Sequence, residues 1–356
     1  MKIGIITQPL RTNYGGILQN YALQTVLKRM GHDVWTIDYS KYDWLDWADH
    51  AWRVVVLKIL GRESHFIGTP YQRNRVEKPL RRFVCKYIQT TQPRTKRIER
   101  KTIKKYAFDA LIVGSDQVWR PMYNCRIEDS FLGFAVEMEI KRVAYAASFG
   151  TDKWEFTLEQ TNRCANLAKL FDGVSVREKS GVTLCKKYLG VKAVQVLDPT
   201  LLLSPDDYSL LCQGISRRKP FVFAYILDEN AKKINYIKEL AERKGLPYII
   251  KGADGAVGEG DTIESWLSYF RDTAFVITDS FHGTVFSIIF NKDFYVFGNE
   301  KRGNSRFVSL LDAFGINDRM INGSFPDDCK KIDWKVVNDA RNKSQFESKS
   351  WLRRNL

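Results

Sequence analysis

Short apolar segments alternate with helical patterns along most of this 356-residue chain, and this alternation limits the folds open to it. The first series of apolar segments lies at residues 2–7, 33–39, 108–113, 142–148, 172–176 and 192–197. The second series lies at residues 221–227, 247–251, 274–279 and 293–297. Strands that alternate with helices form parallel sheets covered by helices on both faces. We therefore predict an α/β protein with two Rossmann-like domains that face each other.

The break between the two series gives the predicted domain boundaries. Asp198-Pro199 follows the last segment of the first series, so we place a first domain at residues 1–198 and a second at 199–332. Residues 41–107 interrupt the first series with Trp-rich and then basic sequence, which predicts a largely helical insertion. Residues 333–356 predict a C-terminal helical tail.

Several classes of protein are disfavoured by the sequence. No apolar run approaches the ~20 residues that a bilayer span needs, and the apolar start turns polar at Thr7, too early for a signal peptide. The six cysteines are scattered without a C-x-x-C pair, and no P-loop, H-E-x-x-H or G-x-S-x-G motif is present. These features predict a cytoplasmic protein with reduced thiols and without a metal site.

Positive charge is concentrated in one segment of the chain. The formal net charge is +15, and residues 71–105 contain thirteen Lys and Arg against only Glu77 and Glu99. Such a patch attracts polyanions, including the anionic surface of a membrane. Aromatic residues are not regularly interleaved there and no recognition module appears, so we expect no nucleic-acid partner. A solvated basic face without a dedicated partner is the alternative.

His282 is the histidine with the most suggestive sequence context. It lies in Thr278-Asp279-Ser280-Phe281-His282-Gly283-Thr284, where a buried strand meets a helix that opens with small residues. Ligands of doubly wound sheets bind at such strand ends, where helix N-termini favour anions, and histidine there can act as acid or base near neutral pH. We expect the imidazole to project into a crevice between the domains. A structural histidine bonded to the turn is the alternative.

Two strand ends of the first domain carry a second group of candidates. Ser115, Asp116, Gln117 and Trp119 follow the strand at 108–113, and a carboxylate, an amide and an indole together are typical of a sugar-binding site. The matching segment after the first strand is Asn13-Tyr14-Gly15-Gly16, which is not a G-x-G-x-x-G dinucleotide motif. The alternative is that Asp116 caps a turn and Trp119 belongs to the core.

Arginines form the third group of candidates. Arg177 follows the strand at 172–176, and Arg302 and Arg306 lie in a glycine-containing loop. Guanidinium groups in such places suit bidentate capture of carboxylate or phosphate. An ordinary salt bridge, such as one between Arg177 and Glu178, is the alternative.

The motifs taken together resemble those of the polysaccharide pyruvyl transferase family. The resemblance rests on NYGGILQNYALQ (13–24), FDALIVGSDQVW (108–119), AYAASFG (144–150), VSVREKSG (174–181), VLDPTLLL (196–203) and VITDSFHGTVFSIIFNKDFYVF (276–297). It covers most of the chain up to residue 307, and leaves the basic insertion and the tail unexplained.

The resemblance implies a GT-B-like fold, with the acceptor on the first domain and the donor on the second. It implies transfer of a pyruvyl group from phosphoenolpyruvate, the donor substrate, to two hydroxyls of a sugar, forming a cyclic ketal and requiring no further cofactor. The sugar would belong to a polysaccharide such as an exopolysaccharide, or to its lipid-linked precursor. Members of this family often carry Arg where this chain has Ser280.

This chemistry needs an acid, a base and an anion clamp, which the candidate residues can supply. We assign His282 as general acid/base, Gly283, Thr284 and Arg177 as the anion clamp, and Arg306 as the substitute for the arginine missing at position 280. Asp116 would orient or activate the acceptor hydroxyl. A GT-B-type glycosyltransferase that uses a nucleotide sugar is the alternative. The basic segment would dock lipid-linked glycans peripherally at the inner membrane face.

Overall fold

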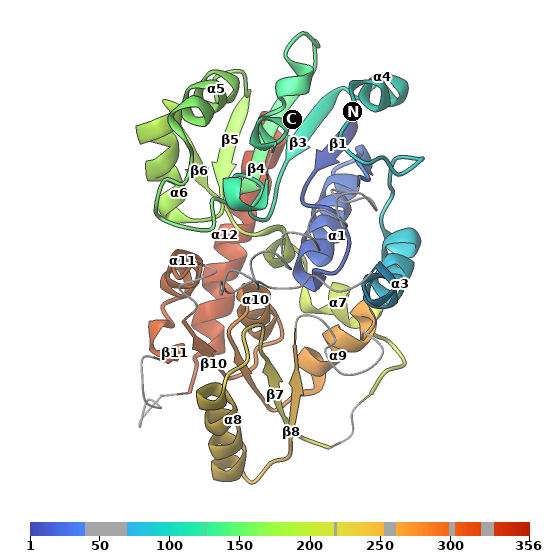
Figure 1. Ribbon diagram of the computed structural model, residues 1–356. Helices are drawn as coiled ribbons and strands as arrows, with labels where there is room; N and C mark the ends of the chain where they lie inside the picture. Colours follow the sequence, from blue (N-terminus) through green and yellow to red (C-terminus); the bar gives the residue numbers. More distant parts are fainter. Residues whose placement is uncertain (40–69, 125, 217–218, 253–260, 299–302, 322–330) are drawn as a thin grey trace, which may run out of the picture.

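The computed structural model places two α/β lobes one above the other (Figure 1). It describes residues 1–39, 70–124, 126–216, 219–252, 261–298, 303–321 and 331–356. The predicted insertion before residue 70, and Arg302, lie outside these described residues. Within the described residues, no helix is both long enough and apolar enough to cross a membrane.

The first lobe is built on a wholly parallel sheet with the strand order β2-β1-β3-β4-β5-β6. Its strands are β1 (Lys2–Ile6), β2 (Asp33–Thr36), β3 (Ala110–Val113), β4 (Lys141–Ala147), β5 (Gly173–Val176) and β6 (Val194–Gln195). Its helices are α1 (Tyr14–Arg29), α3 (Pro70–Tyr87), α4 (Arg100–Tyr106), α5 (Leu158–Ala168) and α6 (Lys179–Leu184). All four residues of β3 are buried, as expected for a parallel strand covered on both faces. Each strand predicted for this domain is present.

The second lobe is built on a parallel sheet with the order β11-β10-β9-β7-β8. Its strands are β7 (Val222–Tyr225), β8 (Tyr248–Lys251), β9 (Phe275–Thr278), β10 (Phe294–Phe297) and β11 (Met320–Ile321). Its helices are α7 (Pro205–Leu211), α8 (Ala231–Lys244), α9 (Ile263–Asp272), α10 (Phe281–Ile289) and α11 (Ser305–Phe314). The sequence did not predict β11, because two residues are too short to show an apolar pattern.

Two connections join the lobes. The chain leaves the first sheet at Gln195 and enters the second at Val222, so the predicted boundary at 198/199 falls between the sheets. The helix α12 (Trp334–Asn355) then runs back along both lobes (Figure 1). One hydrophobic cluster is continuous from β1 and α1 of the first lobe to β9 and α10 of the second. The expected pair of Rossmann-like domains in a GT-B-like arrangement is therefore confirmed.

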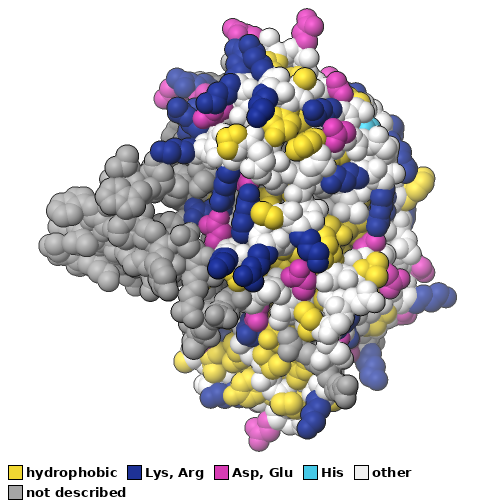
Figure 2. All heavy atoms as spheres, turned by 90° about the vertical axis from the view of Figure 1, so that its right-hand side faces the viewer, with side chains coloured by type: hydrophobic (Ala, Val, Ile, Leu, Met, Phe, Trp, Pro, Cys, Tyr) yellow, Lys and Arg dark blue, Asp and Glu magenta, His cyan; other side chains and the backbone are white. Residues whose placement is uncertain are grey.

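The basic segment forms α3, α4 and the loop between them, on the face shown in Figure 2. Two of its arginines form ion pairs inside the protein. Arg81 and Arg94 both pair with the buried Asp38. Arg94 also pairs with Glu77 over 2.8 Å. The nine other cations whose side chains are described are exposed: Lys78, Arg82, Lys86, Lys96, Arg97, Arg100, Lys101, Lys104 and Lys105. The helical part of the prediction is confirmed for residues 70–87 and 100–106.

The helix α12 fastens the two lobes together through its buried face. Arg341 donates a hydrogen bond to the carbonyl of Ile289 in the second lobe, over 3.3 Å. Farther along, Ser348 Oγ accepts from the backbone N–H of Leu197 over 3.0 Å, and the Trp351 ring packs beside Tyr145 of the first lobe. The position of one lobe relative to the other therefore depends on side chains of the C-terminal tail.

Replacing Trp351 with alanine should destabilise the protein by about 3 kcal/mol, since removal of a large buried ring costs ~3–5 kcal/mol. Trp351 is 7% exposed, whereas Phe346 on the same helix is 70% exposed. Phe346→Ala is therefore the matched control and should change stability by less than ~0.5 kcal/mol. Urea unfolding measures both free energies, and equal effects of the two substitutions would contradict this account of α12.

Candidate active site

The polar residues singled out from the sequence meet at the carboxyl-terminal edge of the first sheet, where it faces the second lobe (Figure 1). Asn13 follows β1, Asp116 follows β3, and Arg177 follows β5. Parallel strands bring their carboxyl ends to the same edge, which explains how these distant segments converge.

Asn13 and Asp116 are joined in a partly buried network. Asn13 caps α1, because its Oδ1 accepts from the backbone N–H of Gly16 over 3.1 Å. Its Nδ2 donates to Asp116 Oδ2 over 3.2 Å. Asp116 has a φ of 69°, a left-handed conformation that non-glycine residues adopt rarely and that is frequent at functional sites. Asp116 is only 6% exposed, so its carboxylate contacts other residues of this sheet edge.

Arg177 is the most heavily bonded cation of this edge. Its Nη1 donates to Asp198 Oδ2 over 2.8 Å, its Nε to Glu178 Oε1 over 3.1 Å, and its Nη2 to Ser148 Oγ over 3.1 Å. Nη2 also lies 4.0 Å from Asp116 Oδ1. Burial alone would lower the pKa of this guanidinium, but the surrounding carboxylates raise it, so Arg177 stays charged.

Asp198 lies at the junction of the lobes and contacts both of them. Its Oδ1 accepts from the hydroxyl of Thr200 over 2.6 Å, while Oδ2 receives Arg177 and lies 3.7 Å from Nε2 of His282. Burial would raise the pKa of this carboxyl, but His282, Arg177 and Thr200 together hold it well below its usual range. Asp198 is therefore an anion placed between Arg177 of the first lobe and His282 of the second.

His282 lies in the first turn of α10, between the two lobes. The imidazole packs against Gly15 of α1 so closely that a Cβ on this glycine would come within 2.0 Å of Nδ1. The side chain is 8% exposed, and among the described residues Nε2 has no hydrogen-bond partner. His282 thus lies between the lobes as expected, but the ring is enclosed by Gly15 and Asp198 and does not project freely into a crevice.

The turn before α10 explains why small residues surround His282. Ser280 caps the helix by accepting from the backbone N–H of Gly283 over 3.3 Å, and Thr284 Oγ1 donates to the carbonyl of Ser280. A Cβ at Gly283 would come within 2.3 Å of Thr278 Oγ1, so only glycine fits. The hydrogen bonds of Ser280, Gly283 and Thr284 among the described residues all join residues of this turn and of α10.

Arg306 approaches the same place from α11. The guanidinium carbons of Arg177 and Arg306 lie 4.3 and 5.5 Å from the centre of the Phe281 ring. Arg306 is 6% exposed, and burial together with the charge of Arg177 lowers its pKa to about 10. An anion bound here would offset both effects, since it would pair with two cations held close together.

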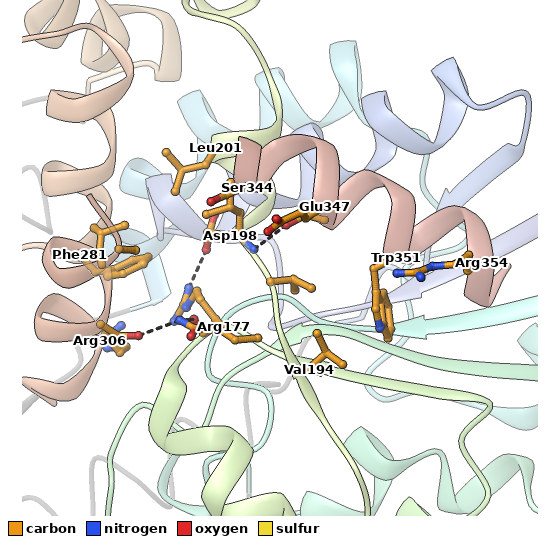
Figure 3. Close-up of a pocket in the computed structure, with 17 residues that line it drawn as sticks. Arg177, Val194, Asp198, Leu201, Phe281, Arg306, Ser344, Glu347, Trp351 and Arg354 are labelled. Atoms are coloured by element: carbon orange, nitrogen blue, oxygen red, sulfur yellow. Dashed lines mark hydrogen bonds and ion pairs between the residues drawn. The ribbon is translucent and has the colours of Figure 1, made fainter. Parts of the chain in front are cut away.

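A cavity of about 290 Å³ opens beside these arginines, between β6, α11 and α12 (Figure 3). Arg177, Asp198, Phe281 and Arg306 line one part of it, and Figure 3 shows the Arg177–Asp198 pair at its centre. His282 does not line this cavity and reaches it only past Asp198. We refer to it below as the arginine cavity.

Trp119 lies in the core of the first lobe and not at a sugar-binding surface. The indole is fully buried, stacks on Phe131 at 4.7 Å between ring centres, and donates from Nε1 to the carbonyl of Ser130 over 2.9 Å. A ring in the core cannot stack on a sugar, so the expected sugar-binding role of Trp119 is wrong and the core alternative holds.

The neighbouring candidates also make internal contacts. Ser115 is buried, with its Oγ 3.1 Å from the carbonyl of Ala146. Gln117 Oε1 accepts from Arg120 over 3.1 Å. Tyr14 reaches the second lobe, where its ring stacks on Trp266 and its hydroxyl donates to the carbonyl of Asp261 over 2.7 Å. Tyr14 therefore joins the lobes.

Asp198 and Phe281 belong to the site, although the sequence does not single them out as candidates. Asp198-Pro199 resembles a break between domains, although a carboxylate directly after a strand pattern is itself a signal for an edge ligand. Phe281 gives no such signal, because an apolar residue beside His282 shows no chemistry by itself. Among the described residues, no group of three or more His, Cys, Asp or Glu is placed to hold a metal ion.

Comparison with known proteins gives one extensive sequence match. The family model described as polysaccharide pyruvyl transferase matches residues 13–301. No curated protein matches the chain.

Solved structures of low sequence identity align with nearly the whole chain. One is a UDP-GlcNAc 2-epimerase from Neisseria meningitidis bound to UDP-GlcNAc, with 11% identity, a TM-score of 0.49, and coverage of 100% of this chain and 94% of that chain. Another is the epimerase of the same kind from Methanocaldococcus jannaschii, with 11% identity, a TM-score of 0.47, and coverage of 96% and 92%. An Escherichia coli heptosyltransferase aligns with 10% identity, a TM-score of 0.36, and coverage of 96% and 99%.

The family match extends from the Asn13 cap of α1 past β10, and so includes the strand ends and the α10 turn that form the site described above. The chain belongs to the polysaccharide pyruvyl transferase family.

Proposed function

We propose that this protein transfers the pyruvyl group of phosphoenolpyruvate to two hydroxyls of a sugar, forming a cyclic ketal. Family membership supports transferase activity. The observation that carries the choice of donor is the arginine cavity, where two buried guanidinium groups flank one ring and line a space of about 290 Å³. Phosphoenolpyruvate is small and carries two anionic groups, a phosphate and a carboxylate, which match two guanidinium groups.

Arg306 supplies the cation that this chain does not carry at position 280. Ser280 and Arg306 lie at the starts of α10 and α11, the helices that follow the adjacent strands β9 and β10. A long side chain from the start of α11 reaches the Phe281 ring at the start of α10. Arg306 therefore brings its charge to the turn at which relatives with an arginine at position 280 would place theirs.

The proposed reaction needs one acid/base group that acts twice. A proton from the imidazolium of His282 adds to the methylene carbon of phosphoenolpyruvate and leaves an oxocarbenium-like centre. The first sugar hydroxyl attacks this carbon and returns its proton to the imidazole. The second hydroxyl then displaces phosphate, which leaves with the remaining proton. Enzyme and imidazolium are restored, and the products are the ketal and inorganic phosphate.

Asp198 is the carboxylate beside His282 in this scheme. Its carboxylate lies 3.7 Å from Nε2, too far for a direct hydrogen bond but close enough for an ion pair with the imidazolium. A reacting atom within hydrogen-bond distance of Nε2 would satisfy this buried nitrogen. Asp116 acts through Asn13 and Arg177 in this arrangement and is a positioning residue for the edge.

The basic face suggests where the acceptor is found. We propose that the exposed cations of α4 and the loop before it bind peripherally to an anionic membrane surface, in the cytoplasm, where a lipid-linked sugar would be presented. Arg97, Lys101 and Lys104 are all exposed, and Lys101 is 82% exposed although it pairs with Glu99. Juxtamembrane cations contribute about 1 kcal/mol each.

Donor binding should be visible as thermal stabilisation. Phosphoenolpyruvate at a hundredfold excess over its dissociation constant should add about 2.7 kcal/mol of stability and raise Tm by several degrees. UDP- and CMP-sugars should leave Tm unchanged. Differential scanning fluorimetry measures both, and stabilisation by a nucleotide sugar without stabilisation by phosphoenolpyruvate would favour a glycosyltransferase instead.

Replacing His282 with glutamine should lower kcat by about 10²- to 10⁴-fold, because a positioned acid or base typically contributes this much. The glutamine keeps a polar group of similar size beside Gly15, and the shift of Tm by phosphoenolpyruvate should persist. Release of inorganic phosphate in the presence of acceptor measures the rate. His32→Gln, in the turn beyond the far end of α1, is the control and should retain full activity. Unchanged turnover in the His282 variant would refute its role.

Charge reversal on the basic face should weaken membrane binding and spare the reaction. The triple substitution Arg97→Glu, Lys101→Glu and Lys104→Glu should reduce binding to phosphatidylserine vesicles by about 10²-fold, following ~1 kcal/mol per charge. Activity on a soluble acceptor should remain. Vesicle co-sedimentation measures the binding.

The matched control reverses three exposed lysines at the outer end of the second lobe, Lys232, Lys238 and Lys244 of α8. It changes the net charge by the same amount and should retain most of the vesicle binding. Equal losses in the two triple variants would show that only net charge matters, and would contradict a dedicated face.

A further inference from the structure

We propose that the acceptor is an uncharged oligosaccharide, and that it binds in a second cavity between the lobes, on the side of α6 and α11. This inference rests on the proposed function, because it names the second substrate of the same reaction. It replaces the strand end at residues 115–119 as the acceptor site, since Ser115, Asp116 and Trp119 are all buried there.

The second cavity has one wall from each lobe. Its first-lobe wall contains the loop of residues 151–155 after β4 and part of α6. Its second-lobe wall is α11 with the two residues before it, from Gly303 to Ala313. Figure 1 shows α6 and α11 on the same side of the molecule, α6 in the upper lobe and α11 in the lower one. We refer to this space as the polar cavity.

The size of the polar cavity suits several sugar units. Its volume is about 1030 Å³, more than three times that of the arginine cavity. This lies at the upper end of the range of ~300–1,000 Å³ typical of ligand pockets. A three-carbon donor would fill only a small part of it, so the occupant expected here is the larger of the two substrates.

The lining of the polar cavity matches hydroxyl groups better than charges. Three cations (Arg120, Lys153 and Lys179) are balanced by three anions (Asp152, Glu155 and Asp312). Seven further residues are polar and uncharged: Thr151, Ser180, Thr183, Gln195, Asn304, Ser305 and Ser309. Sugar hydroxyls both donate and accept, so they can pair with every member of such a set. A polyanion would meet as many carboxylates as cations and gain little.

Part of this lining is held rigid before any ligand arrives. Arg120 is 4% exposed and pairs in bidentate fashion with Glu155, over 2.8 and 2.9 Å. This pair fixes the Glu155 carboxylate at the wall of the cavity. A carboxylate that is already oriented accepts hydrogen bonds from sugar hydroxyls at a smaller cost in side-chain entropy.

The polar cavity and the arginine cavity are neighbours and have three lining residues in common. Gln195, Ser309 and Ala313 line both of them. Gln195 Nε2, from the first lobe, donates to Ser309 Oγ of the second lobe over 2.9 Å and lies 3.3 Å from the carbonyl of Arg177. An acceptor hydroxyl at this end of the polar cavity would therefore lie beside residues that also line the donor site.

Bulky substitutions on opposite walls of the polar cavity test the assignment. Thr183 and Val308 line it from the first and second lobes and are exposed, so tryptophan at either position fills space without disturbing the core. Lys186, exposed just beyond α6 and not part of the lining, gives the matched control Lys186→Trp. Binding is measured on an array of neutral oligosaccharides of two to six sugars and their sulfated or sialylated counterparts.

The wild type and Lys186→Trp should bind neutral glycans. Thr183→Trp and Val308→Trp should bind them at least about 10-fold more weakly, the loss expected from one to three hydrogen bonds, with an unchanged Tm shift on adding phosphoenolpyruvate. Binding of acidic glycans only, binding of no neutral glycan, or equal binding by both cavity variants and the wild type would overturn this inference. If neutral glycans bind but phosphoenolpyruvate does not shift Tm, the proposed donor fails and the polar cavity stands.

Discussion

The buried carboxylate of Asp198 is the charge on which the arrangement of the site depends. It pairs with Arg177 of the first lobe over 2.8 Å and faces His282 of the second lobe at 3.7 Å. Loss of one partner from a buried ion pair is costly because the remaining charge is left uncompensated. This one carboxylate therefore sets the charge at the junction of the lobes, around the proposed reaction centre.

Close backbone contacts allow that carboxylate to reach both lobes. Gly15 lets the His282 imidazole lie against the start of α1. At a second contact, a Cβ on Gly303 would come within 1.6 Å of the carbonyl oxygen of Gly150, so the lobes touch there as well. Because the lobes meet at these glycines and share one hydrophobic cluster, the space between them includes two separate cavities of different chemistry.

The sequence predicted the fold better than it predicted the site. Buried parallel strands are continuous apolar runs, which a single sequence displays directly. The partnership of Asp198 and His282 is not visible in this way, because it depends on how one lobe is placed on the other. Trp119 is a residue that the sequence places at the site but that lies in the core. An aromatic residue after a strand has the same sequence pattern whether it faces a ligand or the core.

Arg306 lines one cavity, and the residues directly before it line the other. Its guanidinium lies beside Phe281 in the arginine cavity, while its helix begins with Asn304 and Ser305 on the wall of the polar cavity. An arginine at position 280 would belong to α10, which contributes no residue to the polar cavity among the described residues. With the cation on α11, one helical turn would contact both proposed substrates. A shift of α11 on binding the acceptor would therefore move the charge that holds the donor.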